Sequence, residues 1–195
     1  MKKRKVLVHR ELVLLYHLGE ETETGAKLRA LLRQMELPFR TLEEEETGCA
    51  LGYVAKINGF QESAPAPQQP PKSELMLMKG FTEKALDALL LGMKQQKIEI
   101  YNKAILTQTN VKWTVAELME ALEEEHQTMV AYEALRQKVE KAQAIGRADC
   151  TEEQWKTLQA AIKQVIERTK YQPTLEIVQQ AAEEFEGAVS GLMGE

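Results

Sequence analysis

Apolar residues in the first half of the chain alternate between continuous runs and helical spacing. One run, Leu12–Leu15, and a second, Leu75–Met78, are each followed by a stretch with the spacing i, i+3, i+4, i+7. That spacing is typical of a helix that buries one face. Each stretch then leads into a short apolar segment. The residues at helical spacing are Leu28, Leu31, Leu32 and Met35 in the first half, and Leu86, Leu89, Leu90 and Met93 in the second.

This repeated pattern predicts two strand–helix–strand units. The first is expected to have a strand at 12–18, a polar and acidic loop at 19–25, a helix at 26–36 and a strand that starts at Pro38. The second is expected to have a strand at 75–78, a helix at 83–96 capped by Thr82, and a strand at 98–101. A short helix at 51–55 should pack against the sheet.

The fold class predicted from these elements is α/β, or α+β if the helices are weighed by content. Strands joined by a helix pair in parallel, and neither unit has enough strands to be stable by itself. We therefore expect duplicated βαβ units, 5–60 and 73–113, to form one four-stranded sheet with pseudo-twofold symmetry in a domain at 5–126. The proline-rich linker 61–72 should run outside it, extended and exposed to solvent.

From residue 114 onward the pattern predicts a helical extension, 114–195, of about three helices. Thr114 and Glu117 form a capping box for a helix at 115–144, and Thr151 and Gln154 form another for the next helix. Pro173 suits the first turn of the last helix, which extends to residue 192.

The last helix carries a narrow apolar seam that alternates by three and four residues. Such a seam packs either inside the chain or against a partner, and the sequence leaves both readings open. In the second reading the C-terminal helices would mediate self-association or bind an unknown protein partner. The candidate interface residues are Leu175, Val178, Phe185, Val189 and Leu192.

Charge and composition exclude some classes of partner. The formal net charge of −5 argues against a nucleic-acid binder, and the basic start Met1–Lys5 is read as a solubilising tail. No apolar run is long enough to span a membrane, and the start lacks the pattern of a signal peptide. We therefore expect a cytoplasmic protein without nucleic-acid or membrane partners. Its two cysteines, Cys49 and Cys150, should be unrelated reduced thiols.

The densest cluster of polar residues lies between the last expected strand and the capped helix. Ligands in open α/β sheets bind beyond the carboxyl ends of strands, and a helix N-terminus there favours anions. One hypothesis is an anion or carboxylate site, with Lys103 as the counter-charge. The alternative is a well-capped structural turn. The candidate residues are Lys103, Thr107, Thr109, Asn110 and Trp113.

Other chemistry has little support in the sequence. The acidic run Glu43–Glu46 is read as a solvated turn, with cation binding as the alternative. Glu123 and His126 form a single Glu-x-x-His motif, whereas di-iron bundles need two with further carboxylates. We predict no catalytic residues, no metal site and no cofactor, although a catalytic triad assembled in space stays open.

Residues Lys103–Thr114, followed by Leu118, Leu122, Glu125 and His126, resemble the signature of a family of small bacterial proteins. The family is a domain of unknown function of the DUF3783 type, with the pattern Lys-Ala-x-Leu-Thr-x-Thr-Asn-x-x-Trp. Leu77–Thr82 and Leu86–Leu90 are similar to the same proteins, as are Leu14–Tyr16, Gly25–Leu28 and Leu51–Tyr53. The resemblance covers about residues 10–128 and implies no activity.

The function expected from the sequence is therefore a non-enzymatic interaction or regulatory module. The alternative is a domain, or an enzyme, that binds a small anion or carboxylate through the turn at 103–113. Fold class does not decide between these functions. They differ in the surface that would bind, which is the C-terminal seam in one case and the turn in the other.

Overall fold

The computed structural model describes residues 11–61 and 69–190. The chain divides into two compact units, with the boundary between Leu122 and Glu123. The basic start Met1–Lys5, most of the proline-rich linker and the candidate interface residue Leu192 lie outside the described residues. Within the described residues, no helix is both long enough and apolar enough to cross a membrane.

The N-terminal unit contains a four-stranded mixed sheet in the order β2-β1-β3-β4. Strands β1 and β2 are parallel, β3 and β4 are parallel, and the two central strands β1 and β3 are antiparallel. The predicted sheet of two parallel pairs is therefore confirmed, and the fold is α+β. The strands are β1 (Leu12–Tyr16), β2 (Phe39–Thr41), β3 (Leu75–Lys79) and β4 (Lys103–Ile105).

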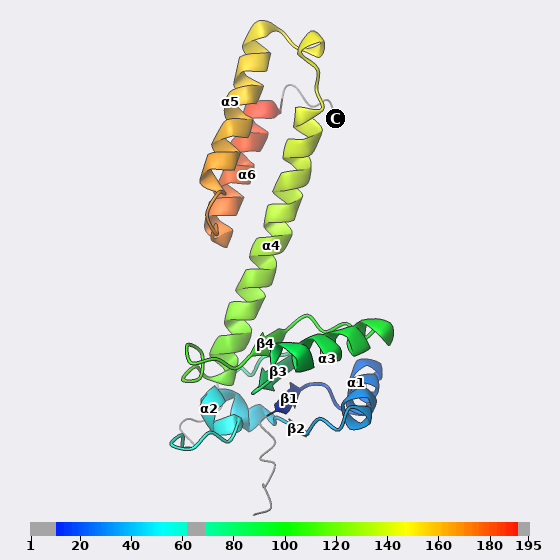
Figure 1. Ribbon diagram of the computed structural model, residues 1–195. Helices are drawn as coiled ribbons and strands as arrows, with labels where there is room; N and C mark the ends of the chain where they lie inside the picture. The colour runs from blue at the N-terminus through cyan, green and yellow to red at the C-terminus, as the bar shows by residue number, and fades with distance from the viewer. Residues whose placement is uncertain (1–10, 62–68, 191–195) are drawn as a thin grey trace, which may run out of the picture. The chain divides into compact units, whose positions relative to one another are not determined.

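Helices cover both faces of this sheet (Figure 1). Helices α1 (Glu23–Gln34) and α3 (Glu83–Gln95) pack on the face to which Val13 and Leu15 point. The short helix α2 (Leu51–Val54) and the first turns of α4 (Val115–Gln143) pack on the other. Because both faces of the central strands are buried, these strands read as continuous apolar runs.

The two halves of the sheet share several backbone features. A residue in the left-handed region follows each central strand, His17 after β1 and Gly80 after β3. Thr22 and Thr82 cap α1 and α3 through their hydroxyl groups. Each helix also ends at a left-handed residue, Glu36 or Lys97, so the two strand–helix segments have matching starts and ends.

Two predicted boundaries in the first half are wrong. Strand β1 ends at Tyr16 rather than at residue 18, because the chain turns at His17 with φ of 53°. Helix α1 begins at Glu23, inside the stretch predicted to be a loop. The Thr22 hydroxyl accepts a hydrogen bond from the Gly25 amide at 3.0 Å, and an acidic residue suits the first turn of a helix.

The strand predicted at 98–101 is also wrong, because the fourth strand begins at Lys103. Residues 98–101 alternate between buried and exposed positions, which is the pattern of a strand. Ile98 and Ile100 are nevertheless buried from a connecting segment. Strand β4 itself lies at the sheet edge, is only three residues long and is mostly exposed, so its sequence carries no pattern of buried positions.

The acidic run at 43–46 forms part of a short 3-10 helix, η1 (Glu44–Gly48), rather than only a solvated turn. Glu46 is partly buried, and its carboxylate lies 2.7 Å from the guanidinium of Arg40. Burial by itself would raise the pKa of Glu46. The Arg40 hydrogen bond, the Glu43 amide and nearby positive charges outweigh burial, so the pKa is lowered.

The C-terminal unit consists of the later turns of α4, the short η2 (Arg147–Asp149), α5 (Glu152–Arg168) and α6 (Leu175–Val189). Helices α5 and α6 lie side by side (Figure 1). The predicted capping box of Thr151 and Gln154 is present. Pro173, however, precedes the N-cap Thr174 and is not in the first helical turn.

The apolar seam of α6 lies in the core of the C-terminal unit. Val178, Phe185 and Val189 are almost fully buried there, together with residues of α4 and α5, and Leu175 is partly buried. Of the two readings of the seam, the structure therefore places these side chains inside the chain. The buried residues from the other helices are Leu135, Val139, Ala142, Leu158, Ala161, Ile162 and Val165.

Candidate functional site

The turn that follows β4 is held by hydrogen bonds among its own residues. The Asn110 side-chain oxygen accepts from the Thr107 amide at 2.8 Å, and its NH₂ group donates to the Ile105 carbonyl at 3.0 Å. The Asn110 amide in turn donates to the Thr107 hydroxyl. These polar groups therefore satisfy the backbone at the end of an edge strand. Thr109 is exposed, as is Trp113.

The same turn also caps two helices. The carbonyls of Val111 and Trp113 accept hydrogen bonds from the Gly52 and Leu51 amides at the start of α2. Thr114 and Glu117 form the predicted capping box at the start of α4. The amides of Thr114, Val115 and Glu117 at the start of α4, which could otherwise face an anion, are thus already bonded.

Lys103 is not brought together with Thr107 and Asn110. It is the first residue of β4, whereas the turn follows the last, so the two lie at opposite ends of the strand. The Lys103 ammonium donates to the Ile100 carbonyl on the side away from the turn. The anion site expected from the sequence is therefore divided between two places.

Lys103 instead lines an open groove between the end of α3 and the start of β4, with a volume of about 690 Å³. Its apolar lining includes Met93, Ile98 and Ile100, which also belong to the core on that face of the sheet. We call this feature the lysine groove. Its lining residues are Leu90, Met93, Lys94, Lys97, Ile98, Glu99, Ile100, Tyr101 and Lys103.

The lysine groove exists because the connection from helix to strand is longer in the second half than in the first. Helix α3 ends with Lys97 in the left-handed region and with the Ile98 amide donating to the Met93 carbonyl at 2.9 Å. Helix α1 ends in the same way. Residues 37–38 then lead directly into β2, whereas residues 98–102 separate the end of α3 from β4.

The charges in the lysine groove are three lysines and one glutamate, in a chain whose net charge is −5. Lys94 and Lys97 are exposed and form no ion pair with a carboxylate of residues 11–61 or 69–190. Their ammonium groups are available to an anionic partner.

A partly buried carboxyl, that of Glu74, lies near Lys103. Burial raises the pKa of Glu74, and this effect exceeds the opposing effects of the Tyr101 amide, which donates to the carboxylate, and of the Lys103 charge. Lys103 is therefore tied to its surroundings by the Ile100 carbonyl and by the field of Glu74. Lys94 and Lys97 are the freer of the three lysines.

A second cavity, of about 370 Å³, lies beyond the carboxyl ends of β1 and β2, and four of its nine lining residues are glutamates. We call it the acidic pocket. His17 Nε2 lies 3.7 Å from the Glu44 carboxylate, and the ring of His17 stacks on that of Tyr16. Its lining residues are Tyr16, His17, Gly19, Glu21, Thr41, Leu42, Glu43, Glu44 and Glu45.

The chain segment before β3 is tied to this end of the sheet. The Tyr16 hydroxyl donates to the Pro71 carbonyl at 2.8 Å, and His17 Nδ1 lies 3.1 Å from the Lys72 carbonyl. Burial, followed by the negative charge of Glu44, raises the pKa of Tyr16. Tyr16 therefore acts as a hydrogen-bond donor that holds residues 71–72 beside β1.

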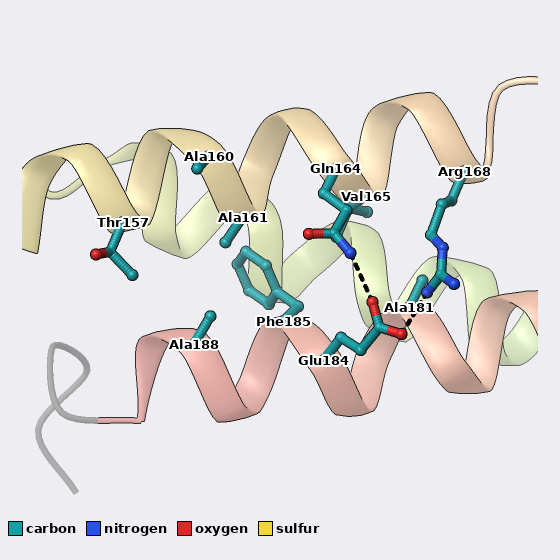
Figure 2. Close-up of a pocket in the computed structure, with 10 residues that line it drawn as sticks. All are labelled: Thr157, Ala160, Ala161, Gln164, Val165, Arg168, Ala181, Glu184, Phe185 and Ala188. Atoms are coloured by element: carbon teal, nitrogen blue, oxygen red, sulfur yellow. Dashed lines mark hydrogen bonds and ion pairs between the residues drawn. The ribbon is translucent and has the colours of Figure 1, made fainter.

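The C-terminal unit has a smaller groove, of about 250 Å³, between α5 and α6. Figure 2 shows Phe185 at its centre and alanine side chains along both helices. At one end, Glu184 accepts a hydrogen bond from Gln164 at 2.6 Å and pairs with Arg168 at 2.7 Å (Figure 2). Because its charged groups already bind one another, this groove offers little to a ligand.

The lysine groove offers groups for binding: ammonium groups that can attract an anion, and an apolar floor that can contact apolar side chains. The sequence reasoning identified Lys103 but missed Lys94, Lys97 and the groove itself. The sequence did contain a clue to this groove. Lys94 and Lys97 directly precede the segment 98–101, in which apolar and polar residues alternate. Among the described residues, no group of three or more His, Cys, Asp or Glu side chains is placed to hold a metal ion.

Residues 74–129 match the model of a family described as a domain of unknown function, DUF3783. The matched segment contains β3, α3, β4, the turn at 107–113 and the first half of α4. It includes all residues of the lysine groove but none of those of the acidic pocket. No curated protein and no solved structure matches the chain.

Proposed function

We propose that the protein is a non-enzymatic interaction module that binds an acidic segment of a protein partner in the lysine groove. The observation that carries this proposal is the combination, in one open groove, of an apolar floor with two exposed lysines, Lys94 and Lys97, that form no ion pair among the described residues. A partner segment with alternating acidic and apolar side chains would complement both features. The binding surface differs from the C-terminal seam considered in the sequence analysis.

The form of the groove favours a peptide segment over a small molecule. Pockets for small molecules enclose most of the ligand surface and hold a few fixed polar groups. Here the two free lysines are exposed, flexible side chains, and Tyr101 at the rim is 76% exposed. Surfaces of this kind bind through charge and apolar contact over several residues of a partner.

A wider set of expectations belongs to the same proposal. We propose that the two halves of the sheet arose by internal duplication, which the matching caps and helix ends support. We also propose that the resemblance to the bacterial family extends upstream of residue 74 and that the protein acts in the cytoplasm. A module whose groove binds an acidic protein segment needs neither a cofactor nor a membrane.

The test is fluorescence anisotropy of the full chain with a labelled synthetic peptide of alternating glutamate and leucine. The proposal predicts saturable binding that weakens as salt is added, because exposed charges are screened. The double variant Lys94→Gln/Lys97→Gln should bind about tenfold more weakly, since each exposed ion pair contributes roughly 0.2–1 kcal/mol.

Two controls make this test specific. Lys84 is an exposed lysine on the same helix but outside the groove, so Lys84→Gln should leave peptide binding unchanged. An unlabelled peptide with lysine in place of glutamate should not displace the labelled peptide from the groove. Equal binding by the double variant and the wild-type chain would contradict the proposal. Binding of free glutamate or acetate with the affinity of the peptide would favour the small-molecule alternative.

A further inference from the structure

One end of the sheet carries two surfaces of opposite charge. At this end of the sheet β1 and β2 finish and β3 and β4 begin. Thr41 of β2 and Lys103 of β4 both lie there. The acidic pocket lies there beside β2, and the lysine groove lies there beside β4. Because β2 and β4 are the two edge strands, the two surfaces occupy opposite edges of the same end.

Neither surface is neutralised within the part of the chain that the structure describes. Glu21 and Glu45 in the acidic pocket pair there with no cation, and Lys94 and Lys97 pair there with no carboxylate. The acidic side chains are exposed, as are the two lysines. Both surfaces therefore keep charge that a second molecule can meet.

We propose that the partner of the lysine groove is the acidic pocket of a second copy of this chain. This inference rests on the proposed function, because it assigns an occupant to the same groove. A twofold axis normal to the sheet, placed just beyond this end, exchanges the two edges. The acidic pocket of each copy then faces the lysine groove of the other, so the contact forms twice.

Charge complementarity is the argument for a second copy. An isologous contact requires that one surface patch be complementary to itself under a twofold rotation. An acidic surface and a basic surface at opposite edges of one end meet this requirement. Because the attraction is between exposed groups, the association should weaken steeply with salt.

The experiment measures the molar mass of the full chain in solution by light scattering, over a range of concentrations and at low and high salt. The wild-type chain should form a dimer at low salt that dissociates at high salt. Two charge-reversed variants complete the design: Lys94→Glu/Lys97→Glu in the groove and Glu43→Lys/Glu45→Lys in the pocket. Each by itself should dimerise at least about tenfold more weakly, because like charges then face each other.

The decisive sample is an equimolar mixture of the two variants. Each variant supplies the surface that the other has lost, so the mixture should regain a heterodimer at low salt. Lys84→Glu, outside the groove on the same helix, should dimerise like the wild-type chain. All substituted side chains are exposed, and circular dichroism of each variant is the check that it is folded.

A wild-type chain that stays monomeric at low salt would overturn this inference. So would a dimer that both reversed variants form as well as the wild-type chain, or a mixture no more dimeric than its components. The proposed function fails separately, if the glutamate–leucine peptide does not bind the wild-type chain. A monomer that binds the peptide would mean that the partner is another protein.

Discussion

Thr41 and Lys103 occupy the two ends of one row of paired residues across the sheet. Thr41 pairs with Leu15 of β1, and Leu15 lies opposite Met76 of β3. Met76 in turn pairs with Lys103. Three strand spacings of about 4.8 Å place the two ends of the row about 14 Å apart. The acidic pocket and the lysine groove are thus fixed at one end of the sheet by its register.

The ion pair between Arg40 and Glu46 should stabilise the N-terminal unit in a pH-dependent way. The variant Glu46→Gln is expected to lose about 1–2 kcal/mol of unfolding free energy at neutral pH, because the hydrogen bonds to a charged carboxylate are lost. The pKa of Glu46 is lowered in the folded state, so this contribution is present above the ordinary value of 4.5. It disappears as pH falls through the folded pKa.

Urea denaturation of both chains between neutral and acid pH measures this difference. The two curves should converge at acid pH. Glu45→Gln is the matched control, because Glu45 is exposed and makes no ion pair in the described part of the chain. A difference between wild type and Glu46→Gln that does not change with pH would mean that the effect is steric and not electrostatic.

The hydroxyl of Tyr16 should hold residues 71–72 against β1. Tyr16→Phe keeps the buried ring and removes only the hydrogen bond to the Pro71 carbonyl, which is expected to cost about 1 kcal/mol. The raised pKa of Tyr16 adds a second effect. In the unfolded chain the phenol ionises first, so the stability contribution declines as pH rises above the ordinary value of 10.0.

Denaturation curves of wild type and Tyr16→Phe at neutral and alkaline pH test both effects. Other tyrosines are common to the two chains, so the difference between them isolates Tyr16. The wild-type advantage should shrink in alkaline solution. An advantage that grows with pH would show that the sign of the pKa shift is wrong.

Asn110 should be a structural residue of the turn after β4. Asn110→Ala removes the exposed hydrogen bonds to Thr107 and Ile105, and their loss is expected to cost about 0.5–1.5 kcal/mol. Thermal unfolding measures this loss, with Thr109→Ala as the exposed control in the same turn. An unchanged stability, combined with loss of phosphate binding measured by calorimetry, would restore the anion hypothesis for this turn.

Phe185 should be central to the stability of the C-terminal unit. It is 2% exposed, and Phe185→Ala is expected to cost about 3–5 kcal/mol because it leaves a cavity between the helices. Trp155 on α5 reports unfolding of this unit by fluorescence in a Trp113→Phe background. Ile177→Ala, at an exposed position of the same helix, should cost less than about 1 kcal/mol.

If the seam of α6 were instead the contact between two copies, the effect of Phe185→Ala would depend on protein concentration. The contact seen here is internal to one chain, so unfolding of the C-terminal unit should be independent of concentration in both wild type and variant. A midpoint of unfolding of the C-terminal unit that rises with wild-type concentration would contradict this reading.

The central strands and the helices on the sheet were predictable because burial on both faces gives continuous apolar runs and helical stripes. The fourth strand was misplaced because Ile98 and Ile100 bury alternate side chains from a connection, whereas the edge strand has little buried surface. Burial pattern alone does not separate these two cases.

The candidate site was only partly predictable for a related reason. Lys103 was found because it stands near a polar turn in the sequence, but the extended strand carries it away from that turn. Lys94 and Lys97 become neighbours of Lys103 only through the helix end and the connection that follows it. The internal position of the α6 seam likewise depends on which helices are available to cover it.

The central claim is that the lysine groove is the binding surface of the N-terminal unit. The most direct measurement is a backbone amide NMR titration of the full chain with the glutamate–leucine peptide. The largest shifts should fall on residues 90–103, which include the groove, and Lys94→Gln/Lys97→Gln should remove them. Shifts centred on residues 107–113, or on α5 and α6, would contradict the account, as would no shift at all.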